Sequence, residues 1–103
     1  MAFDPSLLAK VKTALRISHN ALDEDISDQI EACLADLKVC GVRTAGPDIW
    51  TLDPLIVNAV KLYCRKEYTD DPEKAAEYQK RYDALKSCLM MAEDYREEAV
   101  SNE

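Results

Sequence analysis

The sequence contains few of the residues that usually build catalytic or ligand sites. Glycine occurs only at Gly41 and Gly46, so there is no glycine-rich loop to cradle phosphates. His19 is the only histidine; a single histidine without a paired nucleophile offers no catalytic mechanism, and zinc sites need clustered ligands. We therefore expect a protein that is not an enzyme and that needs no cofactor or metal.

Long apolar runs are also missing. No stretch approaches the ~20 apolar residues of a membrane-spanning helix. The first ten residues, MAFDPSLLAK, lack the basic segment and continuous apolar stretch of a secretory signal. We expect a protein that is made in the cytoplasm and has no membrane partner.

The four cysteines, at 33, 40, 64 and 88, do not form a CxxC pair. Cys33, Cys40 and Cys64 fall on or near apolar helix stripes, where a free cysteine behaves as a small hydrophobic residue. The pattern predicts reduced and mostly buried thiols.

Acidic residues outnumber basic ones, 20 to 13, which gives a net charge of −7. Binding to a phosphate backbone needs concentrated positive charge, so the composition argues against a protein that grips nucleic acid. A chain of 103 residues with 48% hydrophobic content suggests one globular domain.

The chain has clear helix starts and no convincing strand. Asp-Pro pairs stand at 4–5, 53–54 and 71–72; aspartate is a favoured N-cap and proline a favoured first helical residue. Asn20 followed by Asp23 is like a capping box and predicts a fourth start. With apolar residues at helical spacing between these points, the sequence predicts helices over about 5–16, 21–40, 54–69 and 72–97.

The predicted fold is therefore all-α, a compact bundle of about four helices with a long C-terminal helix. We expect residues 1–97 to form a single helical domain and residues 98–103 to form an acidic C-terminal tail. A helix of ~26 residues spans ~39 Å, which is long beside a radius of gyration of ~13 Å for a domain of this size. The end of the last helix is therefore expected to extend beyond the bundle.

Surplus apolar side chains lie on that extending end. Tyr82 and Leu89 belong to the apolar stripe of the helix, whereas Met90, Met91 and Tyr95 lie off it. Apolar surface that is not core usually marks an interface. We therefore expect these three residues to contact another protein.

The loop over residues 41–52, GVRTAGPDIWTL, is longer than most helix connections. Trp50, the only tryptophan, either folds back over the core or joins Arg43 in anchoring a partner. The candidate interface residues are Arg43, Trp50, Met90, Met91, Tyr95 and Arg96.

Three segments taken together resemble a known family. They are LRISHNALDEDISDQIEACLADLKVCGV (15–42), DPLIVNAVKLYCRKEY (53–68) and DDPEKAAEYQKRYDALKSCLMMAEDYR (70–96). Their order and spacing resemble the small head-tail connector, or adaptor, proteins of tailed bacteriophages, which are also called DNA-packaging proteins. The four cysteines have no explanation in that family.

The resemblance implies a structural, head-completion role in the virion. About twelve copies would form a ring under the portal protein, extend the DNA channel and dock a head-completion or tail protein below. DNA would pass through without specific binding, with some carboxylates facing the channel. The alternative from the residues alone is a small helical regulatory protein that binds a host or phage protein through an apolar groove.

Overall fold

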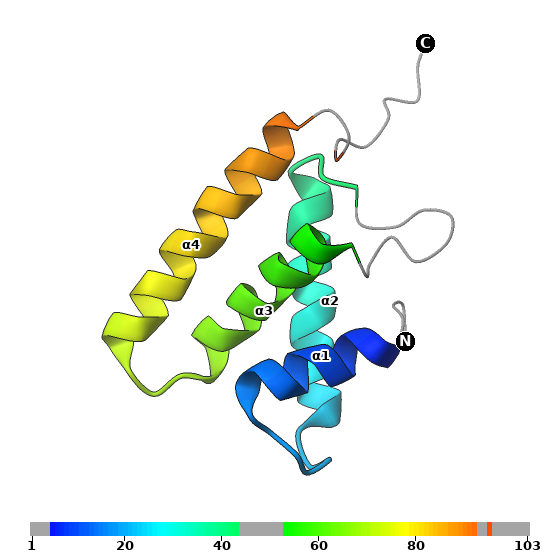
Figure 1. Ribbon diagram of the computed structural model, residues 1–103, viewed down its shortest axis with the longest axis vertical. Helices are drawn as coiled ribbons and strands as arrows, with labels where there is room; N and C mark the ends of the chain where they lie inside the picture. Colours follow the sequence, from blue (N-terminus) through cyan, green and yellow to red (C-terminus); the bar gives the residue numbers. More distant parts are fainter. Residues whose placement is uncertain (1–4, 44–52, 93–94, 96–103) are drawn as a thin grey trace.

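The computed structural model describes residues 5–43, 53–92 and 95, and these form four helices with no strand among them. The helices are α1 (Pro5–Leu15), α2 (Asp23–Val39), α3 (Pro54–Tyr68) and α4 (Pro72–Met91). Figure 1 shows α3 between α2 and α4, with α1 across the lower end. The all-α prediction is confirmed.

Helix α3 is the centre of the bundle and packs against each of the other three helices. A helix with neighbours on several sides must be apolar around much of its circumference. Its buried residues accordingly cover more than one stripe: Ile56, Val57, Ala59, Val60, Leu62 and Cys64.

The outer helices each bury a narrower stripe. In α2 the buried residues recur every three or four positions, as one helix face does: Ile26, Ile30, Cys33 and Leu37. In α4 only Tyr82 and Leu89 are buried, so most of this helix faces outward. Its sequence is correspondingly polar, since a helix with one packed side needs only one apolar stripe.

The thiols lie where the stripes predicted. Cys33 and Cys64 are buried and Cys40 is half-buried, while Cys88 is exposed, and all four are free. Burial raises the pKa of both the Cys33 and the Cys64 thiol to about 12. These two thiols are therefore neutral near pH 7 and act as core residues rather than nucleophiles.

Two of the predicted aspartate caps are present. An Asp53 carboxylate oxygen accepts from the Leu55 N–H at 3.0 Å, and Asp71 accepts from the Glu73 N–H at 2.9 Å. In each case the following proline is the first helical residue. Helix α1 also begins at its proline, Pro5, while Asp4 lies outside the described residues.

The predicted capping box at Asn20 is wrong. Helix α2 begins at Asp23, and the residue before it, Leu22, provides no side-chain cap. The Asn20 side chain instead accepts a hydrogen bond from Lys12 Nζ at 2.8 Å, so a contact with α1 replaces the local cap. Three acidic residues in the first turn still complement the positive end of the helix dipole.

The predicted extension of the last helix to residue 97 is also wrong. Helix α4 ends at Met91, and Ala92 is already extended, with ψ of 122°. At ~1.5 Å per residue its 20 residues span ~30 Å, which is shorter than predicted. Beyond this end, Tyr95 contacts distant parts of the chain, as described below.

Helices α1 and α2 end in the same hydrogen-bonded motif. In α2, Gly41 has a φ of +88°, and the N–H groups of Gly41 and Val42 donate to the carbonyls of Lys38 and Leu37 at 3.0 and 2.9 Å. This is a Schellman ending, which needs one residue in the left-handed conformation. Helix α1 makes the equivalent pair of bonds with Arg16, at φ 62°, in the left-handed position.

These two endings predict opposite effects of substitution. A left-handed residue other than glycine costs ~1–2 kcal/mol. A Cβ at Gly41 would meet nothing within 4 Å, so Gly41→Ala is expected to lose about 1 kcal/mol from backbone conformation alone. Arg16→Gly is expected to gain about 0.5 kcal/mol, because relief of strain exceeds the added freedom of the unfolded chain. Urea denaturation followed by circular dichroism measures the free energy of unfolding of both variants. If both substitutions changed it in the same direction, the left-handed conformation assigned to the two residues would be contradicted.

Candidate interaction surface

Tyr95 joins three chain segments that are far apart in the sequence. Its hydroxyl donates to the Asp53 carboxylate, at 3.0 and 3.1 Å from the two oxygens. Its carbonyl accepts from the Arg43 N–H at 2.7 Å. The segments after α2, before α3 and after α4 therefore meet at one end of the bundle.

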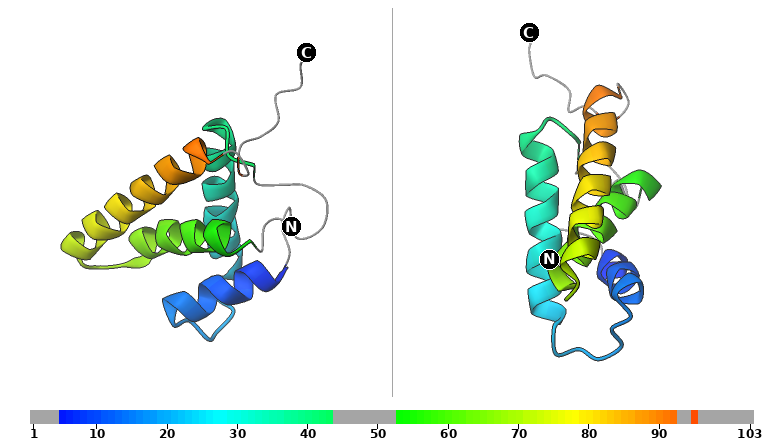
Figure 2. Two further views of the ribbon diagram at one scale, coloured as in Figure 1. Left: turned by 45° about the horizontal axis from the view of Figure 1, so that its top comes forward. Right: turned by 90° about the vertical axis from the view of Figure 1, so that its left-hand side faces the viewer.

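Four large apolar side chains are exposed at this end. Val39 is 85% exposed, Leu55 42%, Met90 41% and Met91 82%. They are the last residue of α2, the second of α3 and the last two of α4, and Figures 1 and 2 show the ends of α2 and α4 on the same side of the molecule. We call these four residues the apolar end.

The apolar end contains every large hydrophobic side chain that is exposed in the described part of the chain. Single exposed apolar residues are common on soluble proteins, whereas several of them at helix ends that meet make a candidate contact surface. Two of the four are methionines, whose flexible side chains adapt to irregular partner surfaces. The arrangement suits binding to another protein.

The structure separates the predicted interface residues into three kinds. Met90 and Met91 are exposed, as expected. Arg43 and Tyr95 are brought together by a backbone hydrogen bond, and Tyr95 is half-buried and packs against the core. Trp50 and Arg96 lie outside the described residues.

Val39 and Leu55 were missed by the sequence analysis. Each is an apolar residue off the core stripe in the terminal turn of its helix, which is the same signal that indicated Met91. This signal is weaker for Val39 and Leu55, because each is a single residue at its helix end whereas Met90 and Met91 are adjacent. Only the folded chain places them at the same end as the two methionines.

A polar network holds α2 and α4 together beneath this surface. The Tyr82 hydroxyl donates to Asp36 at 2.7 Å, and Lys86 Nζ donates to the same carboxylate oxygen at 3.1 Å. The Tyr82 hydrogen bond lowers the pKa of Asp36 below its ordinary value, although partial burial opposes the shift. Burial lowers the pKa of Lys86, but the bond and charge of Asp36 together outweigh this effect and raise it. The network fixes the relative position of α2 and α4, the two helices whose last residues belong to the apolar end.

No group of three histidine, cysteine or carboxylate side chains within 5–43, 53–92 and 95 is placed to hold a metal ion. None of the helices there is both long enough and apolar enough to cross a membrane.

The chain matches one family model. The model is described as phage connector protein, and the match covers residues 7–96. Searches of curated proteins and of solved structures find no significant match.

Proposed function

The chain belongs to the phage connector protein family, and on this premise we propose that it is a structural protein that forms a ring under the portal protein of a tailed phage. Family membership supports a head-tail connector role, a place in the virion and oligomeric assembly with phage head and tail proteins. The ring, the extended DNA channel and the docking of the next head-completion or tail protein are our proposal. We propose no catalytic role.

The family match is the observation that carries this proposal, and the apolar end supports it. A ring needs heterologous contacts, in which one surface of a subunit meets a different surface of the next. Val39, Leu55, Met90 and Met91 are exposed in the single chain. Burial of such side chains in a contact contributes ~1.5–3 kcal/mol each. We propose that the apolar end is one of the contacting surfaces, toward a neighbouring subunit or the portal.

The net charge suits a channel wall for DNA. The chain carries a charge of −7, and we propose that some carboxylates face the lumen. Like charge in the wall weakens contacts with phosphates, within a screening length of ~10 Å at 0.1 M salt. An assembled ring with lysine and arginine lining its channel would contradict this part of the proposal.

The experiment that tests the function is the mass of the purified chain against concentration, by size exclusion with light scattering, with and without the cognate portal protein. We expect a closed species of about twelve subunits, alone or on the portal. A persistent monomer or dimer that ignores the portal would contradict the proposal and favour a small regulatory protein that binds its partner through an apolar groove.

A further inference from the structure

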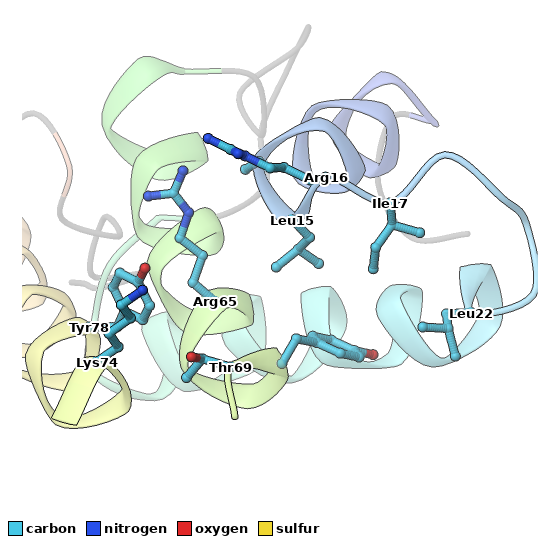
Figure 3. Close-up of a pocket in the computed structure, with 10 residues that line it drawn as sticks. Leu15, Arg16, Ile17, Leu22, Arg65, Thr69, Lys74 and Tyr78 are labelled. Atoms are coloured by element: carbon cyan, nitrogen blue, oxygen red, sulfur yellow. The ribbon is translucent and has the colours of Figure 1, made fainter. Parts of the chain in front are cut away.

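A second surface lies at the opposite end of α4 from the apolar end. It is a pocket of about 660 Å³ between the end of α1, the end of α3 and the start of α4. Leu15, Ile17 and Leu22 contribute apolar lining (Figure 3). The sequence analysis assigned none of these residues to an interaction site.

Three cations line the pocket, namely Arg16, Arg65 and Lys74. Figure 3 shows the Arg16 and Arg65 side chains reaching toward the same space, with Lys74 beside Tyr78. They come from three different helix ends, so only the fold brings them together.

No carboxylate in the described part of the chain pairs with these three cations. The ion pairs found there use Lys12, Lys66, Arg81 and Lys86. Arg65 instead lies over the ring of Tyr78, 5.9 Å from its centroid, a favourable contact for a guanidinium. One carboxylate lies next to the lining, since Asp25 accepts a hydrogen bond from Tyr68. The three cations outnumber it and repel one another, so the pocket favours an anionic occupant on a protein that is otherwise acidic.

We propose that this pocket binds residues 97–103 of a neighbouring copy, namely the predicted acidic tail 98–103 together with Glu97, as one of the contacts between subunits; this segment is called the tail below. This inference rests on the proposed ring. The tail sequence, EEAVSNE, carries three carboxylates, Glu97, Glu98 and Glu103, and two apolar residues between them. Three carboxylates match three cations, and Ala99 and Val100 suit the apolar lining.

The geometry favours a neighbour's tail over the chain's own. Tyr95 is bonded to Asp53 at the start of α3, whereas Arg65 lies 12 residues further along that helix, ~18 Å at 1.5 Å per residue. An extended chain covers ~3.4 Å per residue, so the chain's own tail would need five or six residues to span the distance to the pocket. The pair Glu97 and Glu98 would remain outside it. A tail from one end of a subunit bound to the other end of the next is a heterologous contact, which is the kind that closes rings.

The test measures binding of a fluorescent peptide, EEAVSNE, to the full chain by anisotropy, at a concentration where the chain is monomeric and no neighbour's tail fills the pocket. We expect saturable binding that weakens with salt. The pocket variant Arg16→Gln/Lys74→Gln changes two exposed side chains and is expected to weaken binding about tenfold, since exposed charge pairs contribute modestly. The matched control, Lys10→Gln/Lys80→Gln, makes the same charge change at exposed positions outside the pocket and should bind as the original chain does.

A charge exchange tests the contact in the assembly. Glu97→Lys/Glu98→Lys should lower the assembled fraction on the portal, and combining it with Arg16→Glu/Lys74→Glu should restore it. Restoration by the combined variant supports a direct contact, because neither change alone is compatible with the original partner.

Four results would overturn the inference. They are equal peptide binding by the pocket and control variants, tighter binding of a single-stranded oligonucleotide at the pocket, peptide binding only to a chain with residues 97–103 deleted, and no rescue by the combined variant. The third would mean that each tail fills its own pocket. Peptide binding by a chain that never forms rings would contradict the proposed function alone. Rings formed by a chain that binds no peptide as a monomer would contradict only this contact.

Discussion

Val39→Ser/Met91→Ser is expected to abolish assembly while leaving the single chain folded. Val39 is 85% exposed and Met91 82%, so neither contributes much to the core. In an assembled contact each would be buried, and losing both removes ~3–5 kcal/mol per contact. That weakens each contact by a factor on the order of 10²–10⁴, and the loss is repeated at every subunit. Light scattering with the portal measures assembly, and circular dichroism and thermal melting measure the fold.

The matched control for this variant is Ala9→Ser/Ala76→Ser, which places two serines at exposed helical positions away from the apolar end. It should assemble normally. Tyr95 is unsuitable as a test residue because its hydroxyl and carbonyl bond to the same chain. Normal assembly of Val39→Ser/Met91→Ser would show that the apolar end is not a contact, and an unfolded chain would show that these residues serve the core.

Tyr82→Ala is expected to destabilise the chain by about 3–5 kcal/mol, the usual cost of deleting a buried aromatic ring. Tyr82 is 1% exposed, and its ring packs edge to face on Tyr63, with centroids 5.4 Å apart. A domain of this length has a total stability of ~5–15 kcal/mol, so the loss is a large part of it. Tyr82→Phe keeps the ring and removes the bond to Asp36, with an expected loss of about 1 kcal/mol.

Urea denaturation followed by circular dichroism measures both variants. Tyr78→Ala, a change of the same kind at a half-buried position on α4, is the control and should lose clearly less. If Tyr82→Ala and Tyr78→Ala were equally destabilised, the central place of Tyr82 in the packing would be contradicted.

The pH dependence of stability provides a second test of the hydrogen bond between Tyr82 and Asp36. The pKa of Asp36 is lowered in the folded chain, first by the Tyr82 hydrogen bond. The resulting stabilisation is present above the ordinary value of 3.8 and is lost as the pH falls through the lower folded value. Tyr82→Phe should therefore lose less stability than the original chain as the pH falls below 3.8. An unchanged slope would mean that the hydroxyl does not favour the Asp36 carboxylate.

Much of the fold was predictable because its signals are local. The caps at Asp53 and Asp71 act on N–H groups two residues away, and the α2 stripe depends only on helical spacing. Gly41 ends α2 because glycine tolerates the left-handed conformation. The order of these elements also carries the family resemblance that the match over residues 7–96 supports.

The errors and omissions involve contacts between distant residues. Asn20 loses its predicted capping role because Lys12, eight positions away on α1, takes its side chain. Tyr95, which the sequence analysis placed on the last helix, lies beyond the end of α4 and bonds to Asp53 and Arg43, 42 and 52 positions away. Helix periodicity carries no information about such partners.

The sequence by itself determined the helices, their order, most of the core stripes and the exposure of Met90 and Met91, because each follows from residues within a turn or two. Tertiary structure alone decided where the helix ends meet. It placed Val39 and Leu55 at the same end of the bundle as the methionines, and Arg16, Arg65 and Lys74 around one pocket at the other end. The physical reason is that a surface is made of side chains from separate helices, and their distances depend on how the helices pack around α3.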